Sequence, residues 1–297
     1  MGLSVFATGN AGAVAETVAG HLDCDCGRVQ EHLFPDGETL VRVNPDTVTD
    51  TVAIVAGLDR PNPRMIPLLF LAELLRQCGA AHLLLIAPYL PYMRQDRQFN
   101  PGEGISAFYF ARLLSHYFDA LVTVDPHLHR VHSLDELYSI PARAVAAAPS
   151  VADWIRNNVE QPLLIGPDSE SAQWVEDLAR RTDCPFTVLE KIRRGDRRVE
   201  VSIPDVERWS RHTPVLYDDM ISTGRTMAET VGHLRQAGLR APVCIAVHGV
   251  FADAADRILL EAGADRVVTT NTIPHATNAV DLAGPLAHAT RELIARL

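Results

Sequence analysis

Short apolar runs rich in β-branched residues alternate with segments of helical periodicity along the whole chain. The expected strands are Leu3–Ala7, Thr51–Ala56, Leu83–Ala87 and Ala120–Val124, and then Leu163–Ile165, Phe186–Glu190, Val215–Tyr217, Val243–His248 and Arg266–Thr270. The expected helices are Arg64–Cys78, Ile105–Tyr117, Ser171–Arg181, Thr226–Gln236 and Asp253–Glu261, with glycine C-caps at 79, 238 and 263. Parallel strands need long crossover connections and are buried on both faces. The alternation therefore predicts an α/β fold with mostly parallel sheets flanked by helices.

The series of strands and helices occurs twice. The second series begins after the alanine- and proline-containing stretch Pro141–Pro149. A length of 297 residues suits two domains of about 150 residues each. We expect two similar units in tandem, at residues 1–145 and 146–297. The last helix, 285–297, belongs to the second unit in sequence, and packing back on the first unit is an open alternative.

The charge balance limits the partners. Acidic residues outnumber basic ones by 37 to 27, which gives a formal net charge of −10. General nucleic-acid binders and proteins of anionic membranes need a basic face that replaces phosphate counterions, so we expect neither partner. No apolar run approaches the roughly 20 residues that span a bilayer, and the first residues lack the features of a signal peptide. These observations predict a cytoplasmic protein that binds any polyanionic ligand through local charges.

The cysteines do not form an evident site. The five cysteines, at positions 24, 26, 78, 184 and 244, are too few and too scattered for a disulfide framework. Cys24 and Cys26 are the only close pair, and no second Cys or His cluster stands near them at zinc-like spacing. Free thiols are the favoured interpretation, and a metal or redox site at the pair is the alternative.

The segment Val215–Thr226 is the most specific in the chain. An apolar strand leads to Asp218 and Asp219, and the sequence Ser-Thr-Gly-Arg-Thr then turns into a helix. Ligands of open α/β sheets bind at this edge, where a glycine permits close backbone approach and helix N–H groups suit a phosphate monoester. Two carboxylates before such a loop suit the diol of a phosphorylated sugar, directly or through Mg²⁺. No Walker A or GxGxxG sequence competes with this interpretation.

Four further segments occur in the chain besides this loop, and together they indicate a specific protein family. They are Phe34-Pro-Asp-Gly-Glu38, Arg94-Gln-Asp-Arg97, Thr123-Val-Asp-Pro-His127 and Gly166-Pro-Asp168, and Glu190-Lys-Ile-Arg193 follows them before the aspartate pair. The loop resembles that of the type I phosphoribosyltransferase fold. Together the segments resemble the ribose-phosphate diphosphokinase (phosphoribosyl diphosphate synthase) family over nearly the whole chain, and its archaeal-type branch more than the common bacterial one.

The resemblance implies two tandem phosphoribosyltransferase-like domains and a role for each motif. The N-terminal domain would bind ATP through Phe34, Asp36, Glu38, Arg94, Gln95 and Arg97, the first three from a neighbouring subunit. His127 would bind the Mg²⁺ of Mg-ATP, and Asp168 would help to hold a second metal near the sugar. The C-terminal domain would bind ribose 5-phosphate through Asp218, Asp219, Ser222, Thr223, Gly224 and Thr226, with Lys191 and Arg193 closing over the transferring group.

The implied reaction transfers the β,γ-diphosphoryl group of Mg-ATP to the C1 hydroxyl of ribose 5-phosphate, releasing AMP, in a chain that self-associates at least as a homodimer. Two departures from the family pattern leave alternatives open. Ser169-Glu170 replaces a glycine pair, and Arg225 replaces the second glycine of Thr-Gly-Gly-Thr. A paralogue that acts on another sugar phosphate and a non-catalytic, nucleotide-binding regulatory subunit of a synthase are the alternatives.

Several other residues have a structural as well as a functional interpretation. Arg193–Ser202 is either a solvated hairpin or a basic flap. His129 and His132 stand near His127 but are expected not to bind the metal, since Mg²⁺ rarely recruits several imidazoles. His248 and His275 are expected to form local hydrogen bonds.

Lys191 is the only lysine among the 27 basic residues. A compositional bias explains the excess of arginine, but the retained lysine stands where the family places its flap lysine. An ammonium is a compact point charge, whereas a guanidinium is a wide planar fork, so the two differ at a crowded phosphoryl group. Lys191 is therefore the leading catalytic candidate.

Overall fold

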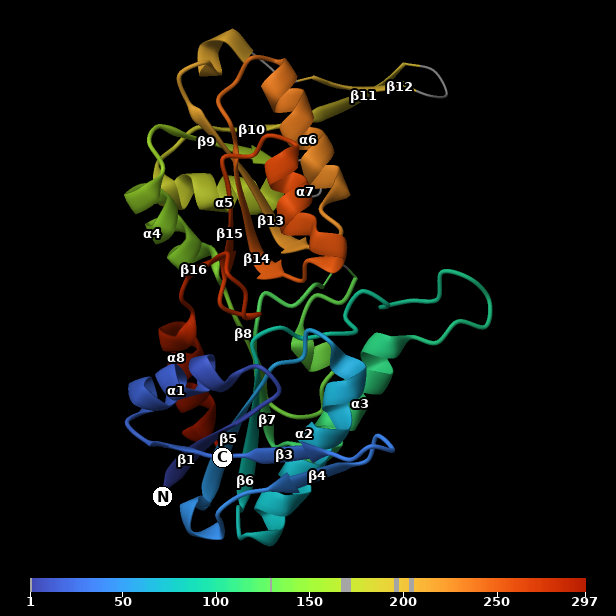
Figure 1. Cartoon of the computed structure of the whole chain (residues 1–297), viewed down its shortest axis with the longest axis vertical. Coiled ribbons are helices and arrows are strands. Elements are labelled where there is room, and N and C mark those ends of the chain that lie inside the picture. Colours follow the sequence, from blue (N-terminus) through green and yellow to red (C-terminus); the bar gives the residue numbers. More distant parts are fainter. Residues whose placement is uncertain (1, 129, 167–171, 195–197, 203–205) are drawn as a thin grey trace. The chain divides into compact units, whose positions relative to one another are not determined.

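The computed structural model describes residues 2–128, 130–166, 172–194, 198–202 and 206–297, with the backbone alone at 172–173, 190–194, 198–202 and 206–207 (Figure 1). The chain divides into two compact units. Unit 1 runs to Ala146 and also contains Thr272–Pro274 and Leu282–Leu297, and unit 2 contains Ala147–Asn271 and His275–Asp281.

Unit 1 is built on a six-stranded parallel sheet in the order β2-β1-β5-β6-β7-β8. The strands are β1 (Leu3–Thr8), β2 (Asp25–Gly27), β5 (Thr51–Ala56), β6 (His82–Ala87), β7 (Ala120–Val124) and β8 (Ala142–Val145). Helices α1 (Gly12–Leu22) and α8 (Ala283–Ile294) pack together on one face, and α2 (Pro61–Gln77) and α3 (Ser106–Tyr117) cover the other.

Helix α8 belongs to unit 1 although its sequence follows unit 2. It packs against α1 and against strands β6, β7 and β8. Arg291 of α8 donates a hydrogen bond to the carbonyl oxygen of His21, and Glu292 pairs with Arg143 of β8 at 3.2 Å. The C-terminal segment thus completes the helical layer on this face of the first sheet.

Unit 2 has the same arrangement of strands. Its parallel sheet has the order β10-β9-β13-β14-β15-β16. The strands are β9 (Pro162–Gly166), β10 (Phe186–Val188), β13 (Thr213–Ile221), β14 (Val243–Gly249), β15 (Arg266–Thr270) and β16 (Asn278–Val280). Helices α4 (Ala148–Asn158) and α5 (Ala172–Thr182) lie on one face, and α6 (Arg225–Gln236) and α7 (Ala255–Glu261) lie on the other.

Each unit also inserts an antiparallel hairpin at the same point of its topology, between its second strand and the central strand. In unit 1 this hairpin is β3 (Gln30–Leu33) with β4 (Thr39–Arg42), and in unit 2 it is β11 (Glu190–Arg194) with β12 (Arg198–Ser202). Short 3-10 turns occupy Pro45–Thr47, Leu134–Glu136, Val206–Trp209 (η3) and Ala252–Ala254 (η4). The two units are therefore equivalent strand by strand.

The central strands show why the apolar runs in the sequence predict buried parallel strands. All six residues of β5 and all seven of β14 are buried, because helices cover both faces of each sheet. Large side chains such as Phe6, Leu71 and Leu114 form the core between the first sheet and α2 and α3. Gly79 follows α2 with a φ of 106°, so the predicted glycine cap is confirmed.

The sequence predicted the long strands and helices within a few residues but missed several short or alanine-rich elements. The stretch 141–149, expected to connect the units, contains β8 and the first residues of α4. Strands β2, β8 and β16 have only three or four residues, too few for a periodic pattern. Helix α1 contains two glycines and small alanines in place of large apolar residues. Within the described residues, no helix has the length and hydropathy needed to cross a membrane.

Candidate active site

The carboxyl edge of the unit 2 sheet holds the segment that the sequence singled out. Strand β13 pairs with β9 only as far as Leu216, opposite Ile165, whereas its pairing with β14 continues to Ile221, opposite Gly249. The end of β13 therefore runs past its pairing with β9. Ligands of open α/β sheets bind outside this edge.

Asp218 and Asp219 lie inside β13, which corrects the prediction that the strand ends at Tyr217. The strand continues because Asp218 still pairs with Ala246 of β14. Successive side chains leave a strand on opposite faces, so the two carboxylates start from opposite sides of the sheet. Both are half-buried, and the Asp219 backbone N–H donates to Asp218 Oδ1 at 2.9 Å. The two acids thus have different environments.

Ser222, Thr223 and Gly224 form the turn from β13 into α6. Gly224 is the N-cap residue, with a φ of 67°, and its carbonyl oxygen accepts a hydrogen bond from Ala228 N at 2.8 Å. The N-cap glycine has no side chain that could cap the first N–H groups of α6, and Thr223 and Thr226 are exposed. The first turn of α6 therefore presents backbone donors and hydroxyls that suit an anion.

The connection between β14 and α7 supports this turn from behind. The backbone N–H groups of Val250 and Phe251 both donate to the carbonyl oxygen of Ile221 at 3.0 Å. A Cβ atom at Gly224 would lie 3.1 Å from Ala255 Cβ, so the first residue of α7 packs directly against the glycine. The turn is thus held closely on the side away from solvent.

Strain accumulates in the supporting connection. Phe251, Asp253 and Ala254 all have φ values between 46° and 57°, a region that L-residues seldom adopt. The Phe251 ring lies 4.5 Å from the His275 ring, and His275 Nδ1 is 2.9 Å from Thr277 Oγ1. His275 was expected to form local hydrogen bonds, and it packs against the connection that lies behind the turn Ser222–Gly224. We call this turn the phosphate turn, because it is the predicted position of the 5-phosphate. Such strain persists where surrounding contacts enforce it, often at functional sites.

The basic segment predicted as a hairpin or a flap is a hairpin. In β11, Lys191 pairs with Val201 and Arg193 with Val199 across the antiparallel ladder. The side chains of this hairpin lie outside the described residues, as do Asp168, Glu170 and His129.

In unit 1, Phe34, Asp36 and Glu38 form the exposed tip of the β3–β4 hairpin. The Phe34 N–H donates to the Glu38 carbonyl at 2.8 Å, and Asp36 Oδ1 accepts from Glu38 N at 3.2 Å. Phe34 is 39% exposed, and its ring meets the His32 ring in an edge-to-face arrangement with 4.6 Å between the ring centres. An exposed aromatic ring at a tight turn is suited to contacting another molecule.

A carboxylate fixes the base of that hairpin to the sheet. Glu31 Oε1 accepts hydrogen bonds from Thr8 Oγ1 at 2.6 Å and from Gly9 N at 3.3 Å, where β1 ends. The hairpin is therefore anchored at the carboxyl edge of the unit 1 sheet. The sequence did not point to Glu31, because a single acid in a short polar strand carries no pattern.

Arg94, Gln95 and Arg97 lie on the loop between β6 and α3, and Glu103 organises this loop. Glu103 Oε2 accepts from Phe99 N at 2.9 Å, from Asn100 N at 3.0 Å and from Gln95 Nε2 at 3.3 Å. Hydrogen bonds from Asn100 and Phe99 lower the pKa of the Glu103 carboxyl. Both arginines are exposed, and the Arg97 guanidinium lies 4.7 Å from the centre of the Phe99 ring.

His127 follows β7 on the neighbouring loop at the same edge and is half-buried. Asp125, two residues before His127, has a φ of 29°, so the backbone is constrained just before the histidine. Arg130 joins this loop to the previous one through a 3.3 Å bond to Asp96 Oδ1, and Asp96 Oδ2 is buried without a hydrogen-bond partner among the described residues. The arginine-glutamine and histidine motifs are thus linked.

The loop of unit 1 that corresponds to the phosphate turn is closed by an arginine. It follows β5, as the phosphate turn follows β13. Arg64 Nη1 bonds to Asn10 Oδ1 at 2.6 Å, to the Gly57 carbonyl at 2.7 Å and to the Asp59 carboxylate. A guanidinium paired with its own carboxylate thus occupies this loop of unit 1, whereas the turn after β13 in unit 2 exposes Thr223 and Thr226.

The alternative sites receive no support from the described residues. The described residues contain no group of three or more His, Cys, Asp or Glu side chains that could hold a metal ion. Cys24 and Cys26 are free, and burial raises the pKa of both thiols. His248 is buried in β14, and the backbone N–H of His132 donates to Glu136.

Two family models match the chain in succession. The N-terminal domain of ribose phosphate pyrophosphokinase matches residues 3–117, and the phosphoribosyl transferase domain matches residues 133–283. The ribose-phosphate pyrophosphokinase of Methanopyrus kandleri is 33% identical over 97% of this chain and 99% of its own length. That of Methanobrevibacter smithii is 30% identical over 94% of this chain and 97% of its own length.

A solved structure agrees over the whole length. The phosphoribosylpyrophosphate synthetase from Mycobacterium smegmatis matches all of this chain and all of its own with a TM-score of 0.85 and 27% identity. The predicted fold class, two tandem phosphoribosyltransferase-like domains, is confirmed. The matched domains, the archaeal relatives and the shared fold agree with one another, and the chain belongs to the ribose-phosphate pyrophosphokinase family.

Proposed function

We propose that this chain transfers the β,γ-diphosphoryl group of Mg-ATP to the C1 hydroxyl of ribose 5-phosphate, forming 5-phosphoribosyl 1-diphosphate and AMP. The C1 oxygen forms a bond to the β-phosphorus, and the bond from that phosphorus to the α,β-bridging oxygen breaks. AMP keeps the bridging oxygen and its electron pair, and the hydroxyl proton passes to solvent. The family name of the relatives supports this reaction.

The open turn after β13 is the observation that carries the proposal. Its glycine, the N-cap residue of α6, has a φ of 67° and no side chain that could cap the first N–H groups of the helix. In the proposed site this turn holds the 5-phosphate. The residues assigned to ribose 5-phosphate are Asp218, Asp219, Ser222, Thr223, Gly224 and Thr226. Because the two carboxylates start from opposite faces of β13, we assign them different contacts.

The ATP side of the proposal rests on unit 1. The Arg94–Arg97 loop, braced by Glu103, offers two exposed guanidinium groups and the Gln95 amide for the nucleotide. The hairpin-tip residues Phe34, Asp36 and Glu38 offer an aromatic face and two carboxylates for adenine. Arginine clusters of this kind recognise phosphates well.

The donor set suits Mg²⁺. Magnesium is bound by one or two protein carboxylates together with substrate phosphates, and unit 2 offers the carboxylates of Asp218 and Asp219 for such a site. Unit 1 separately offers the half-buried His127 at the edge of its own sheet. We assign His127 to the metal of Mg-ATP and Asp168, which lies outside the described residues, to a metal near the sugar. When bound, the metal adds positive charge beside the phosphoryl oxygens.

Lys191 and Arg193 complete the proposed site as cations on the β11–β12 hairpin. Charge develops on the β-phosphoryl oxygens and on the departing oxygen of AMP, so positioned cations stabilise the transition state. The hairpin connects strands β10 and β13 of the sheet that carries the phosphate turn. This placement supports a flap role.

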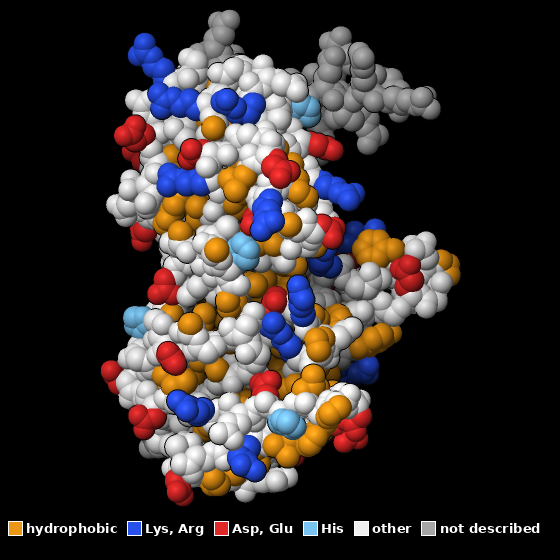
Figure 2. Space-filling model, viewed as in Figure 1, with side chains coloured by type: hydrophobic (Ala, Val, Ile, Leu, Met, Phe, Trp, Pro, Cys, Tyr) orange, Lys and Arg blue, Asp and Glu red, His pale blue; other side chains and the backbone are white. Residues whose placement is uncertain are grey.

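Self-association is part of the proposal. Exposed apolar residues of unit 1 lie on the helices and hairpin of one sheet face, as Figure 2 shows in orange. They include Ile66, Phe70, Phe108, Tyr109 and Leu113, together with Leu33, Phe34 and Leu40 of the hairpin. Contiguous exposed apolar surface of this kind suits contact with a second copy. A homodimer would let the hairpin tip of one subunit reach the nucleotide of the other.

The activity is tested by phosphorus NMR of the protein with Mg-ATP and ribose 5-phosphate. We expect AMP and a new diphosphate on C1, because the attack is at the β-phosphorus. ADP in place of AMP would contradict the proposal. Turnover only with a different pentose phosphate would favour the paralogue, and ATP binding without turnover of any sugar phosphate would favour the regulatory subunit.

Gly224→Ala tests the phosphate turn. Alanine at this left-handed φ is strained by about 1–2 kcal/mol, and its Cβ would meet Ala255 at 3.1 Å, so the turn must shift. We expect KM for ribose 5-phosphate to rise roughly tenfold or more, with little change in KM for ATP. The matched control is Gly238→Ala, at the other end of α6, where φ is 81° but nothing lies within 4 Å. Equal effects of the two variants would contradict the assignment.

Lys191→Arg tests the flap cation. The charge is kept, but a planar guanidinium replaces a compact ammonium, so we expect AMP release to slow at least about tenfold with folding and ATP affinity nearly unchanged. Arg198→Lys on the partner strand is the control and should turn over near the wild-type rate. Wild-type turnover by Lys191→Arg would refute its catalytic role.

The shared site can be tested with the same variant. Co-expression of Lys191→Arg with Phe34→Ala gives mixed dimers in which one site carries both changes and the other carries neither. We expect recovery to about a quarter of wild-type activity if the subunits mix at random. Activity no higher than the average of the two variants would show that each chain supplies both residues to its own site.

A further inference from the structure

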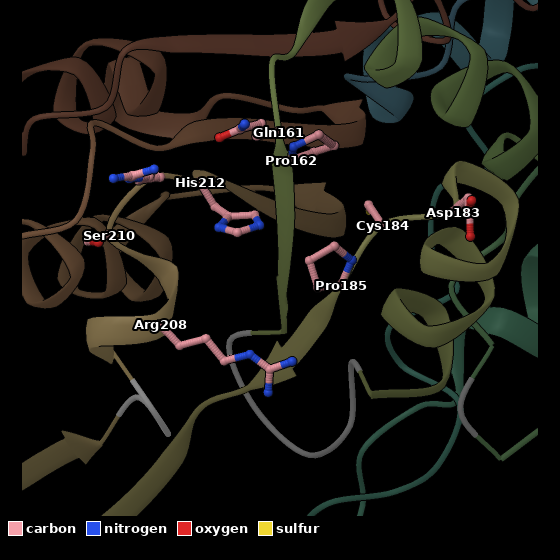
Figure 3. A pocket seen from close by; sticks show the side chains of 9 residues that line it. Gln161, Pro162, Asp183, Cys184, Pro185, Arg208, Ser210 and His212 are labelled. Carbon is pink, nitrogen blue, oxygen red and sulfur yellow. The ribbon is translucent and has the colours of Figure 1, made fainter.

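A cavity of about 470 Å³ opens at the amino edge of the unit 2 sheet, opposite the edge that carries the phosphate turn (Figure 3). Gln161 and Pro162 stand at the start of β9, Pro185 directly precedes β10, and His212 directly precedes β13. Nothing in the proposed reaction uses this cavity. Its volume lies within the range of small-molecule sites.

One wall of the cavity is basic. Arg208 lies in η3, and Ser210, Arg211 and His212 form the short segment that joins η3 to β13. Arg208 and Arg211 are both exposed, and among the described residues no carboxylate lies within ion-pair distance of either guanidinium. The Arg208 guanidinium rests on the Trp209 ring, 4.8 Å from its centre. Two guanidinium groups without acid partners, beside a hydroxyl, favour an anionic ligand.

His212 adds a half-buried imidazole to this wall. Its backbone N–H donates to the Trp209 carbonyl at 2.9 Å, and its ring meets the Trp209 ring edge-on at 5.1 Å. In the described part of the chain, its buried Nδ1 has no hydrogen-bond partner. Because Nδ1 is buried, a molecule in the cavity would meet the accessible part of the half-buried ring and not this nitrogen. Figure 3 shows the imidazole projecting between the two walls.

The facing wall accepts hydrogen bonds and carries one acid. Asp183 is exposed on this wall, and the exposed Gln161 lies closer to His212, as Figure 3 shows; their φ values are 52° and 45°. The Cys184 thiol also lines the cavity, 2.9 Å from Thr182 Oγ1, and burial raises its pKa. Asp183 makes this wall unfavourable for a bare inorganic anion and favourable for a ligand that also carries hydroxyl or amino donors.

From these two walls we infer that the cavity is a second binding site, for a phosphate monoester that also carries hydroxyl or amino groups, of the size of a sugar phosphate or a nucleoside monophosphate. The phosphate lies against Arg208, Arg211 and His212, and the donors of the ligand face Asp183 and Gln161. The segment that contacts the phosphate continues directly into β13, the strand that carries Asp218 and Asp219 at its other end. The inference does not depend on the proposed reaction.

Trp209 provides the reporter for the test. In the variant with Trp154→Phe and Trp174→Phe, Trp209 is the remaining tryptophan of the three in the chain. Its emission should change when a ligand draws Arg208 away from its ring. We expect a saturable change on titration with AMP or ribose 5-phosphate, a weaker one with inorganic phosphate, and none with adenosine, which lacks the phosphate. The relative affinities of AMP and ribose 5-phosphate distinguish the two sources of the phosphate ester.

Substitutions at the cavity separate this site from the active site. Arg211→Gln, at an exposed position, should weaken AMP binding about tenfold, because it removes a charge-assisted hydrogen bond, and should leave turnover unchanged. Arg240→Ala, exposed elsewhere in unit 2, is the control for net charge and should have no effect. An emission change that Arg211→Gln leaves at full affinity, with AMP or with ribose 5-phosphate, would place the ligand outside this cavity and overturn the inference. For ribose 5-phosphate, loss of the change in Gly224→Ala would then identify the active site as its position. Equal responses to AMP and to sulfate would show an adventitious ion only.

Discussion

Parallel strand pairing is the constraint on which the rest of this structure depends. A parallel strand can be followed by its neighbour only after a crossover, so every strand of a sheet ends at the same edge. In unit 2 this rule brings the turn after β13 and the connection after β14 together. Backbone N–H groups of the connection after β14 donate to the carbonyl oxygen of Ile221, the last residue of β13. In unit 1 it brings together the loops that carry Arg94 and His127. The burial of β5 and β14 between helical layers keeps both edges fixed.

The two units carry different loops at equivalent positions of the same topology. At the position after the central strand, unit 2 has an open glycine turn, whereas unit 1 has a loop filled by Arg64 and its partner Asp59. At the position after the second strand, unit 1 has an acidic and aromatic hairpin tip, whereas unit 2 has the basic hairpin of Lys191. We propose that the duplicated fold in this way provides the 5-phosphate turn in unit 2 and the nucleotide contacts in unit 1. The net charge of −10 is compatible with polyanionic substrates because the cations are local.

Much of this arrangement could be predicted from the sequence, because the patterns that specify most strands and helices lie within short segments of the chain. Long apolar runs such as Thr51–Ala56 and cap glycines such as Gly79 act through near neighbours, and both appear as expected. The aspartate pair was placed wrongly, because the end of β13 is set by its pairing with β14, which no local pattern encodes. Arg64 closes its loop through Asn10, 54 residues away in sequence, so its role became visible only in three dimensions.

The central claim is that the C1 hydroxyl attacks the β-phosphorus of ATP at a site whose sugar phosphate is held by the turn after β13. The most direct measurement uses ATP labelled with ¹⁸O at the α,β-bridging position, with ribose 5-phosphate as acceptor. Attack at the β-phosphorus cleaves the bond between that phosphorus and the bridging oxygen, so the label should appear in the phosphate of AMP. Label in the diphosphate on the sugar, or in ADP, would contradict the account.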